Sequence, residues 1–170
     1  MTGTKAQCIT YLANIKGDNK MYEVKEHKPK RGNKANNYFH RLVGLLAQGE
    51  KAKFYAKKNE LIMQYGNRKH MYKGDTLDYR IEPVSYDWMS DPEDHLEPSQ
   101  YMWEVEGKPT LRLYWKLCGT RTYDSAEMAH LIDCTRDECV GCGIPWEEIE
   151  TFEEKRIMER LRRQGERKHN

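Results

Sequence analysis

Long hydrophobic runs are missing from this chain of 170 residues, of which only 38% are hydrophobic. Its mean hydropathy is −0.99, and no segment approaches the roughly 20 apolar residues that a membrane-spanning helix needs. Residues 1–20 also lack the apolar stretch and cleavage pattern of a secretory signal. We therefore expect a cytoplasmic protein with no membrane contact. The length fits one domain with a thin core, or one domain and a tail.

Signatures of catalysis and of metal binding are also scarce. The chain has no Walker loop, no G-x-S-x-G and no H-E-x-x-H, and its odd number of cysteines argues against a disulfide framework. Cys134, Cys139 and Cys142 have a spacing that suggests zinc, with His130 as a fourth ligand. They fall within one helical pattern, however, where a free cysteine acts as a small hydrophobe. We expect neither a bound metal nor a cofactor there.

One acidic cluster leaves a catalytic alternative open. Carboxylates with one histidine are ligand types that metal-dependent nucleases use, and the chain groups five such residues in a short stretch: Asp91, Glu93, Asp94, His95 and Glu97. A solvated acidic loop would look the same. The cluster therefore supports a nuclease only as a rival hypothesis.

Charge is unevenly distributed along the chain, although the net charge is only +2. Residues 1–73 hold 16 Lys and Arg against 5 Asp and Glu, whereas residues 74–154 hold 6 against 20. Residues 155–170 are basic again. A basic end of this kind is typical of nucleic-acid binding, and the acidic middle would pair with it or meet a basic partner.

The first half of the chain predicts two strands and two helices. Strands are expected at Gln7–Ile15 and Lys20–Glu26, joined as a hairpin, and a loop follows at 28–37. The next segment has helical spacing of its apolar residues, namely Phe39, Leu42, Val43 and Leu46. A second helix is expected over Ala52–Tyr65, with Gly66 ending it in a left-handed conformation.

The second half predicts an acidic insert, one clear strand and two helices. Residues 67–109 read as a long loop with short strands near 79–84 and 101–105. Thr110–Cys118 alternates as a strand. Asp124 and Glu127 then form a capping box for a helix that ends at Gly143. The buried stripe expected on that helix is Met128, Leu131, Ile132, Thr135, Cys139 and Cys142.

Together these elements predict an α+β fold rather than a doubly wound parallel sheet. We expect a small mixed sheet, made of the N-terminal hairpin and the central strand, packed with three to four helices. Residues 1–150 would form a single domain with the insert at about 67–109. Residues 151–170 would form a charged helix or tail.

The loop expected at residues 28–37, which is rich in Lys and Arg, gives the strongest functional signal. Clustered cations suit phosphates, and aromatic rings on which bases stack suit single strands. The loop also leads into a helix whose first amides favour anions, and a second contact is expected between the central strand and the capped helix. The predicted nucleic-acid contacts are Lys28, Lys30, Arg31, Lys34, Asn36, Tyr38, Arg41, Arg121 and Tyr123.

Two stretches resemble a known family. KRGNKANNYFHRLVGLLAQ, residues 30–48, is similar to the segment that opens the first helix of phage NinB (Orf-like) recombination proteins. GTRTYDSAEMAHLIDCTRDECVGCGIPWE, residues 119–147, is similar to the C-terminal block of that family. Both blocks in this order also resemble related phage proteins labelled as HNHc nucleases, although this chain has no recognisable His-Asn-His triad.

The resemblance implies a phage-encoded accessory protein of recombination or replication in the bacterial cytoplasm. Such proteins form homodimers, bind single-stranded DNA, and help to load a recombinase or annealing protein onto strands coated by single-strand-binding protein. The contacts that it implies are Arg31, Asn36, Arg41 and Arg121. In this interpretation the protein is not an enzyme. The alternatives are a metal-dependent phage nuclease, or an interaction protein that captures a host factor through its acidic segment.

Overall fold

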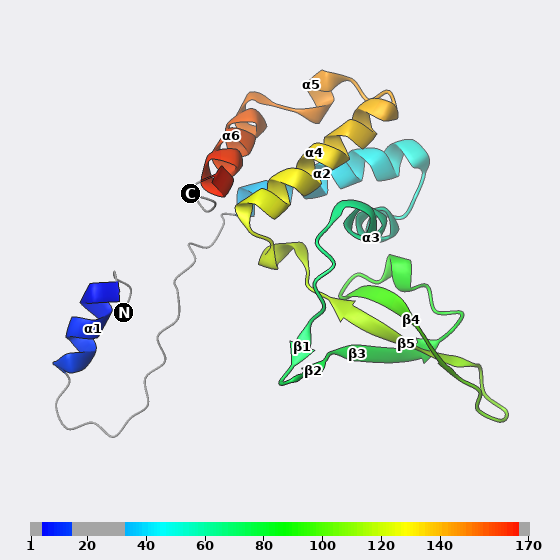
Figure 1. Ribbon diagram of the computed structural model, residues 1–170. Coiled ribbons are helices and arrows are strands. Elements are labelled where there is room, and N and C mark those ends of the chain that lie inside the picture. Colours follow the sequence, from blue (N-terminus) through cyan, green and yellow to red (C-terminus); the bar gives the residue numbers. More distant parts are fainter. Residues whose placement is uncertain (1–4, 15–32, 167–170) are drawn as a thin grey trace. The chain divides into compact units, whose positions relative to one another are not determined.

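The computed structural model describes residues 5–14 and 33–166, and the chain divides into two compact units, Met1–Lys30 and Arg31–Asn170 (Figure 1). In the first unit α1 covers Lys5–Ala13, so the strand predicted at Gln7–Ile15 is wrong. Thr10 donates its hydroxyl to the carbonyl of Ala6 over 3.0 Å, which shows how a β-branched residue is accommodated in a helix. The strand predicted at Lys20–Glu26 lies outside the described residues.

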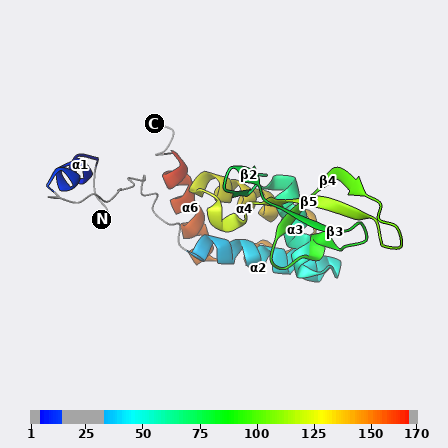
Figure 2. The same cartoon turned by 90° about the horizontal axis from the view of Figure 1, so that it is seen from below.

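In the second unit a group of helices forms the main core. These helices are α2 (Asn33–Glu50), α3 (Phe54–Tyr65), α4 (Ser125–Gly141), the short α5 (Trp146–Ile149) and α6 (Phe152–Glu166). The predicted stripe of α2 is confirmed, because Phe39, Leu42, Val43 and Leu46 are all buried. The helix also begins earlier than expected, at Asn33 within the predicted loop. Helices α2 and α4 pack against each other (Figures 1 and 2).

Helix ends follow the predicted chemistry at α4 but not at α3. The capping box of Asp124 and Glu127 is present, as expected. Gly66, by contrast, has φ −79°, so the predicted left-handed end of α3 is wrong. Cys139 is buried as expected, whereas Cys142 lies beyond the last turn of α4 and is exposed.

Helix α6 confirms the predicted C-terminal helix. Its Met158 and Leu161 are buried in the common core, and α6 packs against α4. Residues 152–166 therefore form part of the second compact unit, not a separate tail.

All the β-strands among the described residues lie within residues 72–117, and one isolated bridge joins His70 to Leu117. A small hairpin pairs β1 (Tyr72–Lys73) with β2 (Thr76–Leu77). The main sheet is antiparallel with the order β3 (Tyr79–Pro83), β5 (Leu111–Leu117) and β4 (His95–Trp103), and β4 and β5 extend away from the helices (Figures 1 and 2). The α+β class and the strands at 79–83 and 111–117 are confirmed. The strand expected at 101–105 begins earlier, at His95, and within residues 5–14 and 33–166 the sheet contains no segment of the predicted N-terminal hairpin.

Two turns of 3-10 helix complete the unit. The first, η1 (Trp88–Ser90), packs against α3 and β4, and the second, η2 (Thr120–Thr122), joins β5 to α4. Within residues 5–14 and 33–166, no helix has both the length and the apolar character needed to cross a membrane.

Candidate nucleic-acid interface

The predicted contacts in the basic loop are only partly described. Lys28, Lys30 and Arg31 lie outside the described residues. Lys34 is exposed in the first turn of α2, and its Nζ lies 3.6 Å from a carboxylate oxygen of Glu153, which is also exposed. An exposed pair of this kind is weak, so Lys34 remains accessible to another anion.

Tyr38 and Arg41 instead fix α2 to the C-terminal helices. The Tyr38 side chain is only 2% exposed and donates its hydroxyl to the carbonyl of Ile149 over 3.0 Å, and burial raises its pKa. Its ring therefore offers no face to a base, and the predicted stacking role is wrong. Arg41 makes a bidentate ion pair with Glu154, with N–O distances of 2.7 and 2.6 Å, and also donates to Ile149.

Beside these two residues lies a cavity of about 300 Å³ between α2 and α6. Lys34, Tyr38 and Arg41 line it together with Glu153 and Glu154. The two carboxylates offset the two cations, so this cavity is not suited to a phosphate.

The second predicted contact region separates into a buried and an exposed residue. Tyr123 is 4% exposed and donates its hydroxyl to the carbonyl of Asn67 over 3.2 Å, so it does not stack on a base either. Arg121 is exposed. Thr120 donates to Oδ1 of Asn36 over 2.7 Å, and the structure thereby brings the beginning of α2 beside η2. The two stretches that carry the family resemblance are neighbours in space.

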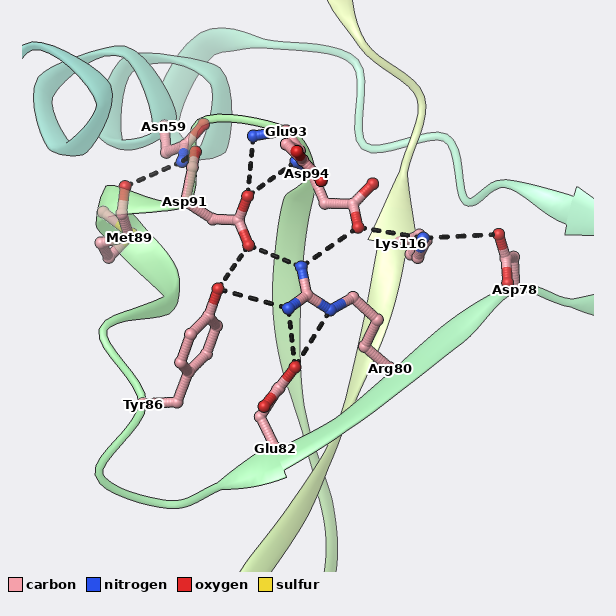
Figure 3. A network of polar contacts seen from close by, with 10 residues as sticks. All are labelled: Asn59, Asp78, Arg80, Glu82, Tyr86, Met89, Asp91, Glu93, Asp94 and Lys116. Carbon is pink, nitrogen blue, oxygen red and sulfur yellow. Dashed lines mark hydrogen bonds and ion pairs between the residues drawn. The ribbon is translucent and has the colours of Figure 1, made fainter.

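The acidic cluster is organised around a cation that sequence reasoning did not identify. Arg80 on β3 lies 2.6 Å from Asp91, 2.6 Å from Glu82 and 3.3 Å from Asp94 (Figure 3). Lys116 lies 2.9 Å from Asp94. These carboxylates therefore neutralise side chains of the sheet instead of converging on an open site.

Asp91 is the centre of this network. It is buried, which tends to raise its pKa, but the Tyr86 hydroxyl, the amides of Asp94 and Glu93, and Arg80 outweigh burial and hold the pKa at about 2. The two amides lie 2.9 and 2.8 Å from one carboxylate oxygen. Asp91 is thus a structural carboxylate that holds the η1 segment on the sheet (Figure 3).

His95 and Glu97, the other members of the acidic cluster, contact different neighbours. His95 Nδ1 lies 2.6 Å from Oδ1 of Asn59 on α3, and Glu97 pairs with His70 over 3.1 Å and with Arg68 over 3.6 Å. Among the residues that the structure describes, no three or more His, Cys, Asp or Glu side chains are grouped to hold a metal ion. The arrangement therefore offers no support for the metal-dependent nuclease alternative.

The cysteines near α4 are also dispersed. Cys139 is buried with its thiol directed at the carbonyl of Leu42, and burial raises its pKa to about 11. Cys134 lies beside the His130 ring at 3.8 Å, and Cys142 is exposed. These three cysteines therefore do not converge on a shared zinc site.

A surface that the sequence did not reveal lies on the main sheet. Tyr79 and Glu97 are both in register with Trp115, so the three residues share one face. We define the aromatic face as the large side chains on that side: Tyr79, Ile81, Tyr101, Trp103 and Trp115. Four of them are well exposed, at 51% for Tyr79, 47% for Ile81, 52% for Tyr101 and 43% for Trp103.

Trp115 lies at the centre of the aromatic face. The rings of His70, Tyr79 and Tyr101 meet its ring edge to face, with centroids 6.3, 6.4 and 6.4 Å away and interplanar angles of 82°, 83° and 86°. Edge-to-face packing is a favourable aromatic geometry, so the rings fix one another in place, and no helix or strand of residues 33–166 covers them.

The opposite face of the sheet is covered. Tyr114 is fully buried there against Tyr86 and Trp88, and the Arg80 network lies on the same side (Figure 3). The sheet therefore has one face in the core and one exposed face rich in rings.

Sequence reasoning missed the aromatic face because strand pairing decides it. The alternation of β5 did place Trp115 on one side of a strand, and Tyr79 and Tyr101 were expected in strands. Only the register shows that these residues, which come from three strands, meet on one surface.

A comparison of the chain with family models, curated proteins and solved structures finds no match.

Proposed function

We propose that this protein binds single-stranded DNA as an accessory factor of phage recombination or replication. The observation that carries the proposal is the aromatic face, where exposed Tyr and Trp rings form a surface without a covering element among the described residues. Stacking of bases on aromatic side chains is a general mode of single-strand binding, and it is worth roughly 1–3 kcal/mol per base. Dimer formation and loading of a recombinase or annealing protein follow from the family resemblance and belong to the same proposal.

The geometry favours single strands over duplexes. Rings on a sheet reach bases only where the bases are unpaired and splayed out, because a duplex keeps its bases stacked inside. Glu97 is an acidic side chain in register with the aromatic face, and its neighbour Arg68, 3.6 Å away, offsets part of its charge. Electrostatic repulsion of a strand by this carboxylate is therefore reduced.

The basic segments supply the phosphate contacts in this proposal. Lys34 is exposed at the start of α2, and Lys28, Lys30 and Arg31 precede it in the sequence. Neutralising phosphates releases counterions, so affinity is expected to fall as the salt concentration rises.

Fluorescence anisotropy with labelled oligothymidine and a matched duplex, over a salt series with magnesium or EDTA, tests the proposal. We expect the single strand to bind more tightly than the duplex, and the Tyr79→Ala/Tyr101→Ala variant to bind it at least about tenfold more weakly, the cost of one lost stacking contact. Phe152→Ala is the matched control, because Phe152 is an exposed ring on α6. Equal binding of single strand and duplex, or no binding at low salt, would refute the proposal. Magnesium-dependent cutting of the label would instead favour a nuclease.

A further inference from the structure

Four nitrogen-bearing side chains from four elements gather where the sheet meets the helices. We call this group the cationic junction: His40 on α2, Lys58 on α3, His95 at the start of β4, and Arg121 on η2. The predicted sites cover it only in part, since Arg121 was predicted as a nucleic-acid contact and His95 as a member of the acidic cluster.

Direct contacts hold the four elements together at this point. Thr120 bonds Asn36 over 2.7 Å, which joins η2 to α2. The Phe54 ring meets the His40 ring edge to face, with centroids 6.0 Å apart, which joins α3 to α2. His95 contacts Asn59 over 2.6 Å, which joins β4 to α3.

Helical spacing places the junction residues on the same side as these contacts. His40 follows Asn36 by four residues, and Lys58 follows Phe54 by four, so each lies one turn along the same helix face. The charge of Arg121 lowers the pKa of both His40 and Lys58, so its guanidinium lies within electrostatic reach of both side chains. The His95 ring lies against Gly119, where an added Cβ would be 3.4 Å from its Nε2.

Within the described residues the junction has no acidic partner of its own. Lys58 and Arg121 form no ion pair there, although Lys58 is half-buried. Burial lowers the pKa of Lys58, and Arg121 lowers it further. Asp91 and Asp94 act on His95, but both are engaged by Arg80. Burial lowers the pKa of His40 and brings that of His95 to about 4, so both imidazoles are neutral near pH 7. The positive charge of the junction therefore comes from Lys58 and Arg121, and it has no acidic partner among the described residues.

Hydrogen-bonding capacity is also unused at the junction. Nε2 of His40 is buried and has no partner, and a buried polar group of this kind is costly unless something satisfies it. Asn59 donates its amide to the carbonyl of Met89 over 2.8 Å, so its Oδ1 faces His95 as an acceptor. His95 therefore carries its proton on Nδ1, and Nε2 is left with a lone pair.

We infer that the cationic junction of His40, Lys58, His95 and Arg121 binds a phosphate group. A phosphate supplies negative charge to pair with Lys58 and Arg121, and its oxygens accept from these two side chains and from the N–H that the unpartnered Nε2 of His40 presents. His95, whose proton lies on Nδ1, borders the group without donating to it. This inference deepens the proposed function and rests on it for the source of the phosphate, which is either an internal phosphodiester or the terminal phosphate of a strand.

The junction is close enough to the aromatic face to serve the same strand. His95 is in register with Leu117, and Leu117 lies two residues from Trp115 on β5. Two residues along a strand span about 7 Å. One nucleotide can therefore reach from a stacked base to the junction.

Inorganic phosphate is the first probe, titrated into the full chain at constant ionic strength while imidazole ¹⁵N resonances are recorded. We expect saturable shifts of His40 and His95. Lys58→Gln and Arg121→Gln should each weaken the phosphate affinity about tenfold, the cost of a charge-assisted hydrogen bond. Lys155→Gln, at an exposed lysine of α6, should bind as the wild type does. Because Arg121 is exposed, its substitution keeps the test valid even if Lys58→Gln is unstable.

The absence of a saturable shift in the wild type, or a shift unchanged in both variants, would overturn the inference. Oligothymidine with a 5′-phosphate or a 5′-hydroxyl then identifies the source. A preference for the 5′-phosphate indicates a terminal group, whereas equal binding with a salt slope lowered by about 0.7 in Arg121→Gln indicates a backbone phosphate. Phosphate binding without strand binding would refute only the proposed function. Strand binding without phosphate shifts would refute only this inference.

Discussion

Gly66 shows how a single residue limits what the fold tolerates. A Cβ at this position would overlap the carbonyl oxygen of Ile62 and the hydroxyl of Tyr123. Glycine is therefore required because other atoms approach the backbone closely at the end of α3. A left-handed backbone is not the reason, since φ of Gly66 is −79°. Gly44, in the middle of α2, has no atom within 4 Å of such a Cβ.

The two glycines should respond to alanine with opposite signs. Gly66→Ala should lower the free energy of unfolding by about 1–3 kcal/mol, because a packed site is overfilled. Gly44→Ala should raise it by about 0.5–1 kcal/mol, because alanine favours the helix at no steric cost. Urea denaturation followed by circular dichroism measures both. A Gly66→Ala protein as stable as the wild type would contradict the close packing of Tyr123 on α3.

Single residues also explain why two predicted contacts failed. Tyr38 and Tyr123 have the chemistry that nucleic acids need, but the same chemistry joins secondary structure elements: their hydroxyl groups donate to the carbonyls of Ile149 and Asn67. Residue type alone does not separate these two uses. Burial does, and burial depends on segments more than 50 residues away in the chain.

At the scale of elements, local patterns predicted the helices well. The 3.6-residue period of α2 and the capping box of α4 are local properties, and both are confirmed. The alternation of β5 correctly predicted a strand, although burial along that strand does not alternate, because Leu113 and Tyr114 are both buried. The N-terminal strand was wrong because a short segment with alternating apolar residues fits a helix equally well. The bounds of β4 were missed because Pro98 and a register shift between Pro98 and Met102 interrupt its pattern.

The Asp91 network couples elements and makes their packing depend on pH. The folded pKa of Asp91, about 2, lies below its ordinary value of 3.8. Its carboxylate therefore contributes stability that is fully present above the ordinary value and is lost as the pH falls from about 4 toward 2. Asp91 joins the η1 segment to β3 through Arg80, so we expect this segment to loosen first in acid.

Asp91→Asn tests that coupling. At pH 7 the variant should lose roughly 2 kcal/mol, because Arg80 is left without its buried partner, and its Tm should fall by about 6 °C. Between pH 4 and pH 2 its Tm should decline less steeply than that of the wild type. Glu93→Gln, at a neighbouring exposed carboxylate, is the control. Parallel declines for Asp91→Asn and the wild type would contradict the role assigned to Asp91.

At the scale of the whole molecule, ion pairs within the fold explain part of the uneven distribution of charge along the sequence. Acidic residues of the middle segment pair within the fold with cations of the basic first segment, namely Arg41, Lys53 and Lys69. The sequence did predict a cation near η2, Arg121, and the proximity of Asn36 to that turn now links the two family-like stretches. The aromatic face and the cationic junction were not predictable, because each is assembled from several elements by tertiary pairing.

The central claim is that bases, as well as phosphates, are recognised on the aromatic face. The most direct measurement compares the affinity of the wild-type chain for oligothymidine with its affinity for an abasic strand of the same length and charge. We predict that the strand with bases binds at least about tenfold more tightly, since each stacked base contributes roughly 1–3 kcal/mol, and that Tyr79→Ala/Tyr101→Ala removes this difference. Equal affinities of the wild type for the two strands would contradict the account.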